Sequence, residues 1–170
     1  MIYSRSAEYA IRAFVYLATV PPGKFAMAKQ VAGDSDIPAH FLAKILQQLA
    51  RKGFLKSSKG PTGGFSLAIA PKDISLCQIV DAVDGLADYK RCLGGRTECR
   101  DDAPCGLHDS WKRMRSSIID YLEGTSIAAV ASSLEQKRRA LGLLGIAEAS
   151  ASGCDRAAGA GPRRDASKNG

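Results

Sequence analysis

Residues 37–69 read IPAHFLAKILQQLARKGFLKSSKGPTGGFSLAI, and they carry the main information about the fold. Its first half repeats apolar residues at helical spacing. Pro38 suits the first turn of that helix, and Gly53 suits the position just past its end. Its second half holds two strand candidates, 54–58 and 64–69, joined by the basic, glycine-rich turn 59–64. The stretch therefore predicts a helix followed by a two-stranded hairpin.

The helix predicted at 38–52 has two different faces. One face is apolar, and we expect it to be buried: Phe41, Leu42, Ile45, Leu46 and Leu49. The other carries small and polar residues: Ala39, His40, Ala43, Lys44 and Gln47. An ordinary solvent-facing side would hold more glutamate. Glutamine pairs with adenine and lysine reaches guanine acceptors in the major groove, so this face suits DNA.

The flanking segments complete a recognisable order. Apolar spacing predicts a helix at 6–20, ended by Pro21 and Pro22, and a short helix near 27–32. Helix, short helix, turn, helix and hairpin is the order of a winged helix-turn-helix, whose second helix enters the major groove. The hairpin would be the wing. We expect it to meet the DNA backbone through lysines and flexible glycines: Lys56, Lys59, Gly60, Gly63 and Gly64.

Charge is unevenly distributed. Residues 1–72 hold ten Lys and Arg against three Asp and Glu, which accounts for the chain's net charge of +7. A basic domain of this kind is the electrostatic footprint of a nucleic-acid binder. We find no signal peptide and no apolar run long enough to span a membrane, so we expect a cytoplasmic protein without a membrane partner. No triad, phosphate loop or pair of catalytic carboxylates is readable, so we do not expect an enzyme.

A second motif follows a helix expected near 76–83. Cys92, Cys99 and Cys105 are spaced by six and five residues, and His108 comes two residues further on. Thiolates are the usual ligands of iron–sulfur clusters. Gly94 and Gly95 give the loop freedom to wrap a cluster. Zinc is the rival metal, although the C-x2–4-C spacing typical of zinc sites is missing. A metal-free thiol switch is a further alternative.

The surroundings of these cysteines fit the same chemistry. Arg91, Arg96 and Arg100 can offset the negative charge of a thiolate-ligated centre. We expect Pro104 to begin a long amphipathic helix, which puts Cys105 in its first turn, where the helix dipole favours thiolate. The other two cysteines have different roles: Cys77, in an apolar run, is expected in the core, and Cys154 is expected to be an exposed thiol without a role.

Three stretches together resemble one family: MIYSRSAEYAIRAFVYLA at 1–18, the block at 37–68, and ISLCQIVDAVDG at 74–85, followed by the spaced cysteines. They are similar to the Rrf-two family of bacterial winged-helix transcription regulators, which includes iron–sulfur sensors of the IscR and NsrR types. The resemblance runs from residue 1 to about 145. It implies a mainly α fold with a two-stranded wing and a long C-terminal dimerisation helix.

The resemblance also implies a division of the chain and a ligand set. The DNA-binding domain would span 1–83, the cluster-binding loop 84–104, and the dimerisation helix with a trailing short helix 105–145. Residues 146–170, poor in large apolar residues, are expected to be a disordered tail. Cys92, Cys99 and Cys105 match the three cysteine ligands, although the first gap is one residue longer than in the IscR type. For the fourth ligand, His108 matches a 2Fe–2S site and Glu8 a 4Fe–4S site, and the sequence leaves both open.

These inferences predict a homodimeric DNA-binding transcription regulator, a repressor, acting on double-stranded DNA with a palindromic operator. Its operator affinity would be controlled by an iron–sulfur cluster that senses redox state, nitric oxide or iron and cluster supply. Two alternatives stand beside it. One is an iron–sulfur or thiol redox protein that acts through a protein partner, and the other is a cluster-free regulator with structural zinc.

Overall fold

The computed structural model describes residues 2–35, 37–60, 63–97 and 99–142. The chain divides into two units, residues 1–134 and 135–170, and the first holds the elements that concern the site. Within the described residues the first unit is mostly helical, with one two-stranded antiparallel sheet, β1–β2. The predicted fold class, a mainly α chain with a winged helix-turn-helix, is confirmed.

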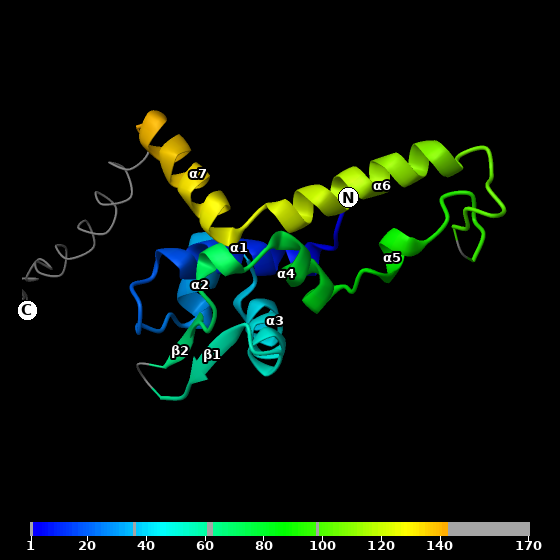
Figure 1. Cartoon of the computed structure of the whole chain (residues 1–170). Coiled ribbons are helices and arrows are strands. Elements are labelled where there is room, and N and C mark those ends of the chain that lie inside the picture. Colours follow the sequence, from blue (N-terminus) through cyan, green and yellow to red (C-terminus); the bar gives the residue numbers. More distant parts are fainter. Residues whose placement is uncertain (1, 36, 61–62, 98, 143–170) are drawn as a thin grey trace, which may run out of the picture. The chain divides into compact units, whose positions relative to one another are not determined.

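Three helices form the helix-turn-helix portion (Figure 1). Helix α1 runs over Arg5–Thr19, and the side chain of Ser4 caps it by accepting the N–H of Ala7 at 3.1 Å. Helix α2 covers Ala28–Ser35, and α3 covers Ala39–Arg51. Pro38 directly precedes α3 rather than lying in its first turn, and Gly53 follows it with φ +85°, so both ends lie within one residue of the predicted 38–52.

The wing is the hairpin of β1, Leu55–Ser58, and β2, Gly64–Leu67, with Leu55 opposite Leu67 and Ser58 opposite Gly64. A third segment joins its edge. Ala26, just before α2, exchanges two backbone hydrogen bonds with Phe65, at 3.0 and 2.9 Å. The wing is therefore attached to the helical part by backbone pairing as well as by side chains.

The core lies between α1, α3 and the helix that follows the wing. Its largest fully buried side chains include Phe14, Leu42, Leu46, Leu49, Ile79 and Val80. One expected member is missing. Phe41 is 38% exposed, because it lies at the edge of the apolar stripe of α3, where its ring packs edge-to-face with Tyr9, with centroids 5.9 Å apart. The prediction that Phe41 is buried was wrong.

After the wing, the short 3-10 helix η1, Pro71–Asp73, leads into α4, Leu76–Val83. The four-residue α5, Ala87–Lys90, comes next, and then the cysteine-containing loop. The long helix α6 covers His108–Gly124, and α7 covers Ile127–Ala140. Backbone bonds from Leu76 to Thr125 and from Ile127 to Ile74, both 2.9 Å, fasten the α6–α7 turn beside the start of α4.

Candidate nucleic-acid interface and metal centre

The outer face of α3 is as polar as the sequence predicted. His40, Lys44 and Gln47 are exposed, whereas Ala39 and Ala43 are half-buried. Arg51, seven residues beyond Lys44 and therefore on the same side of the helix, is also exposed. The sequence reasoning missed Arg51, although continuing the helical spacing by one more turn would have found it. This face offers two cations, an amide and an imidazole to a groove.

The end of α3 is bound to the end of α4. Lys52 Nζ donates to the carbonyl oxygen of Ala82 at 2.6 Å, and Gln48 Nε2 donates to the same oxygen at 3.2 Å. Ala82 lies in the last turn of α4, where helical carbonyls lack intrahelical partners and cations are favourable. The orientation of α3 is therefore coupled to that of α4.

The wing carries its predicted cations at the surface: Lys56 and Lys59 are exposed, as is Gly60. At two other positions of the wing, a side chain would clash with the protein's own backbone. A Cβ at Gly63 would lie 2.4 Å from the carbonyl oxygen of Ser58, and one at Gly64 would lie 2.3 Å from that of Ala26. Close backbone packing therefore explains Gly63 and Gly64, and their contact with DNA stays a prediction.

In the cysteine loop, two thiols lie beside the same glycine. A Cβ at Gly94 would be 3.3 Å from Cys105 Sγ and 3.7 Å from Cys92 Sγ. Hydrogen bonds from the backbone N–H groups of Arg96 and Gly94, together with a bond from Cys105, hold the pKa of Cys92 below its ordinary value. The absent side chain of Gly94 thus leaves room for two sulfurs at one place in the loop.

The third thiol faces the histidine. Cys99 Sγ lies 3.4 Å from His108 Nδ1, and His108 Nε2 lies 2.8 Å from Asp101 Oδ1. Lys112 Nζ also binds both carboxylate oxygens of Asp101, at 2.8 and 2.9 Å. Lys112, and after it His108, lowers the pKa of Asp101. His108 itself is only 5% exposed.

Helix α6 begins later than the sequence predicted. The prediction that Cys105 lies in the first helical turn was wrong, because the helix starts at His108 and Cys105 precedes it in a turn closed by a 2.9 Å bond from His108 N–H to the Cys105 carbonyl. Gly106, unfavourable inside a helix, accounts for the delay. The dipole argument therefore does not apply to Cys105.

The predicted ligands thus form two pairs, Cys92 with Cys105 and Cys99 with His108. Within the described residues, no three His, Cys, Asp or Glu side chains converge closely enough to hold a metal ion. The donor chemistry nevertheless fits an iron–sulfur cluster. Three thiols share one loop, and an imidazole whose far nitrogen meets a carboxylate is the usual arrangement of a ligating histidine. The assignment of these four residues as cluster ligands stays a prediction.

The alternative fourth ligand lies on another element. Glu8 is in the first turn of α1, where its carboxylate is 3.6 Å from Arg12 Nη1. This partner is on its own helix, outside the cysteine loop. A role for Glu8 would therefore require the reach across a dimer that the sequence resemblance implies.

Hydrogen bonds attach the start of the loop to its surroundings. Asp84 accepts from the backbone N–H and the hydroxyl of Ser4, at 2.8 and 2.5 Å, and the Tyr89 hydroxyl donates to the carbonyl of Ile2. From α6, Trp111 Nε1 donates to the carbonyl of Arg91 at 3.0 Å. The segment before Cys92 is consequently bound to both α1 and α6.

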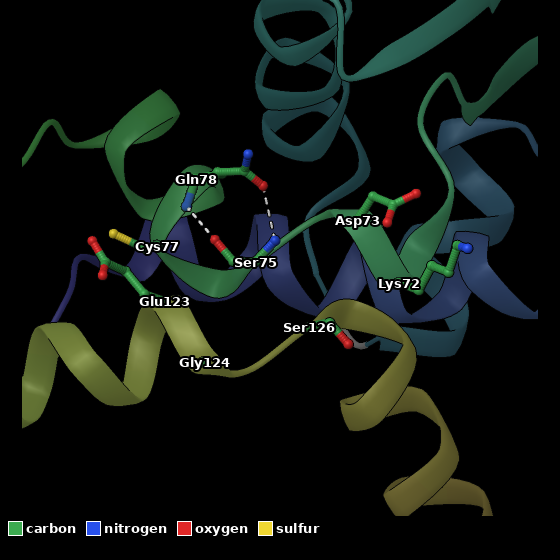
Figure 2. A pocket seen from close by; sticks show the side chains of 8 residues that line it. All are labelled: Lys72, Asp73, Ser75, Cys77, Gln78, Glu123, Gly124 and Ser126. Atoms are coloured by element: carbon green, nitrogen blue, oxygen red, sulfur yellow. Dashed lines mark hydrogen bonds between the residues drawn. The ribbon is translucent and has the colours of Figure 1, made fainter.

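A pocket of about 390 Å³ lies where α4 begins beside the end of α6 (Figure 2). Ser75 and Gln78, which line it, form a reciprocal capping box that occupies N–H groups at the start of α4. Cys77 also lines it but is buried. Burial, and then Glu123 and Asp81, raise the pKa of Cys77. As predicted, Cys77 is a core residue, and none of the predicted site residues lies in this pocket.

A winged helix-turn-helix with an exposed basic reading helix and a basic wing defines a DNA-binding transcription regulator. The chain belongs to the Rrf2 family, described as an iron-dependent transcriptional regulator, which matches residues 3–133. The predictions of family, fold and a non-enzymatic DNA-binding regulator are confirmed. No helix among the described residues is long and apolar enough to cross a bilayer.

Individual relatives agree with this assignment. An HTH-type transcriptional regulator of Aquifex aeolicus is 36% identical over 129 residues, which cover 75% of this chain and 89% of that protein. IscR of Aliivibrio salmonicida is 27% identical over 128 residues, covering 75% of each chain. Among solved structures, CymR of B. subtilis, a global cysteine regulator, has a TM-score of 0.66 at 22% identity over 76% of this chain and 95% of its own. IscR of T. potens has a TM-score of 0.65 at 21% identity, over 79% and 89%.

Proposed function

We propose that this regulator is a homodimeric, cytoplasmic repressor whose affinity for a palindromic operator is controlled by an iron–sulfur cluster. Cys92, Cys99 and Cys105 would hold the cluster, with His108 as the fourth ligand and Glu8 as the alternative. The observation that carries the proposal is a pair of thiols, Cys92 and Cys105, in the same loop as Cys99, which contacts the buried imidazole of His108 at the start of α6. Such a cluster, of the 2Fe–2S or 4Fe–4S type, would supply chemistry sensitive to oxygen, nitric oxide, and iron or cluster supply.

The hydrogen bonds around the loop support a coupling to DNA binding. Asp84, at the end of α4, accepts from Ser4 at the start of α1, and Ala82, two residues earlier, accepts from Lys52 at the end of α3. A change in the loop would thus act on the anchorage of the reading helix. In a dimer, a change in the relative pose of two reading helices alters the match to operator half-sites.

An apolar stripe along α6 and the residue that precedes it supports the dimer. Leu107, Met114 and Tyr121 follow one another at seven-residue spacing and are 48%, 60% and 62% exposed. The half-buried Trp111 and Ile118 lie between them, at intervals of three and four. This is the spacing by which two helices pair along a seam. We propose that α6 pairs with α6 of a second copy.

The decisive experiment is anaerobic purification followed by iron and acid-labile sulfide analysis, an absorption spectrum and operator footprinting. We expect a coloured protein with iron and sulfide, and footprints that differ between the loaded and cluster-free forms. Cys92→Ala should lose iron, whereas Cys154→Ala, outside the loop, should keep it. Full iron content in Cys92→Ala would overturn the ligand assignment.

The same preparation tests the alternatives. Zinc without sulfide would favour the cluster-free regulator with structural zinc, and the absence of any protected palindrome would favour a redox protein acting through a protein partner. Identical operator binding by both forms would contradict control by the cluster.

A further inference from the structure

Both ring nitrogens of His108 have partners. Nδ1 lies 3.4 Å from Cys99 Sγ, and Nε2 lies 2.8 Å from Asp101 Oδ1. An ionised carboxylate only accepts hydrogen bonds, so Nε2 must carry the hydrogen in this contact. In the neutral imidazole the lone pair is then on Nδ1, the nitrogen that faces the thiol. One hydrogen bond thus decides which nitrogen is available as a donor atom.

Asp101 is itself held in place. Lys112, four residues after His108 on α6, binds both of its carboxylate oxygens, at 2.8 and 2.9 Å. A loop carboxylate therefore spans two neighbouring positions on one helix face. The Asp101 side chain is 72% exposed, so removing it leaves no cavity in the core. Its role is consequently local, and a variant there should fold.

We infer that Asp101 is a positioning residue for the metal centre, which fixes the orientation and tautomer of His108 so that Nδ1 is presented on the side of Cys99. The inference rests on the proposed function, because it takes His108 as the fourth ligand. Partners of this kind raise ligand basicity, and their loss typically lowers metal affinity by about 10–100-fold.

The chain provides a matched control. Asp102, the next residue, bonds Arg100 at 2.9 and 2.5 Å. It has the same charge and lies in the same loop, but its carboxylate binds Arg100, whereas the carboxylate of Asp101 binds His108. Asp101→Ala and Asp102→Ala therefore remove equal charge, but only the first removes the bond to the imidazole. Asp101→Glu restores a carboxylate with a longer reach.

The first test uses metal-free, reduced protein with nitrogen-15 in its histidines. The chain has only two histidines, so exposed His40 is an internal reference for His108. The spectra are recorded at alkaline pH, where an ordinary histidine side chain is neutral. We expect the His108 signals of the wild type and Asp102→Ala to report a hydrogen on Nε2. Asp101→Ala should show a mixture of tautomers, and Asp101→Glu should recover the wild-type pattern.

The second test measures iron loss to a chelator from anaerobically loaded protein, together with histidine-nitrogen coupling to the reduced cluster by electron–nuclear double resonance. Asp101→Ala should lose iron about 10–100-fold more readily than Asp102→Ala and show altered nitrogen coupling. Equal iron loss in the two variants, or an unchanged His108 tautomer in Asp101→Ala, would overturn the role of Asp101 and leave the proposed function standing. A wild-type chain that takes up no iron and sulfide would overturn the proposed function, and with it the metal role of Asp101.

Discussion

Gly64 is the residue at which the wing depends most directly on the absence of a side chain. Its φ is +149°, and a Cβ there would lie 2.3 Å from the backbone oxygen of Ala26. We predict that Gly64→Ala lowers the free energy of unfolding by more than about 2 kcal/mol, because the backbone pairing of Ala26 with Phe65 must shift to make room. Urea unfolding followed by circular dichroism measures this loss.

Gly33 provides the opposite case. It lies inside α2, and a Cβ added there would meet no other atom within 4 Å outside the helix's own backbone. Gly33→Ala should raise the free energy of unfolding by about 0.5–1 kcal/mol, because alanine loses less backbone entropy in a helix than glycine. Equal effects of the two substitutions would contradict the steric explanation for Gly64.

Two cysteines differ in reactivity for physical reasons. Backbone hydrogen bonds from Arg96 and Gly94 lower the pKa of Cys92, whereas burial raises the pKa of Cys77. A lowered pKa means more thiolate at neutral pH, and thiolate is the nucleophile. In metal-free protein, we predict that iodoacetamide modifies Cys92 faster than Cys77. As pH is raised, the modification rate of Cys92 should begin to increase at a lower pH than the rate of Cys77. Peptide mass spectrometry over a pH series follows both, and coinciding pH profiles would exclude this explanation.

At the scale of elements, the start of α1 is tied to the end of α4. Ser4 caps α1 and donates its backbone N–H and hydroxyl to Asp84. We predict that Ser4→Ala costs about 1–2 kcal/mol of unfolding free energy, since the cap and a bond to a charged acceptor are lost together. The double variant with Asp84→Ala should cost less than the sum of the single variants in thermal unfolding.

Ser117→Ala is the control for this pair. The exposed Ser117 hydroxyl donates to the Arg113 carbonyl of its own helix, so its loss should change stability by less than about 0.5 kcal/mol. Full additivity of the Ser4 and Asp84 variants would mean that the two elements are not coupled through this contact.

Elements with a regular apolar period were predictable from the sequence. Boundaries at which neighbouring residues favour different conformations, or at which a side chain lies at the border of the buried face, were not. The spacing in α3 and the proline and glycine at its ends indicated its limits, and the glycine-rich turn indicated the hairpin. The start of α6 was misplaced because Gly106 weakens a turn that Pro104 favours. Phe41 was misassigned because it lies at the border of the buried stripe, where the partner, Tyr9, comes from another helix.

In the candidate metal site, too, only part of the arrangement could be predicted from the sequence. The sequence spacing selected the three cysteines and His108, yet it carried no information on which thiol lies beside which group. The pairing of Cys99 with His108, and the bond from His108 to Asp101, depend on the path of a loop without periodicity. Asp101 and Asp102 are identical neighbours in sequence, and only the structure separates their partners.

At the scale of the whole molecule, substitutions in the stripe of Leu107, Met114 and Tyr121 test whether the protein is a dimer. We predict that the double variant Met114→Glu, Tyr121→Glu sediments as a monomer, because two carboxylates per chain would face each other across the seam. Ser116→Glu, an exposed position on another side of α6, should remain dimeric. A wild-type chain that is monomeric at micromolar concentration would contradict the pairing of α6.

The net positive charge of residues 1–72 predicts that binding of the regulator to its operator DNA depends steeply on salt concentration. Each phosphate that a lysine neutralises releases counterions, so the logarithm of the operator association constant should fall with the logarithm of salt concentration by about 0.9 per contact. Lys59→Ala, in the exposed wing, should weaken binding to all sequences and flatten this slope by about 1 per chain. Lys72→Ala, exposed on η1 outside the wing, should leave the slope unchanged. Fluorescence anisotropy over a salt series measures both, and a slope near zero in the wild type would mean that phosphate contacts do not carry the binding.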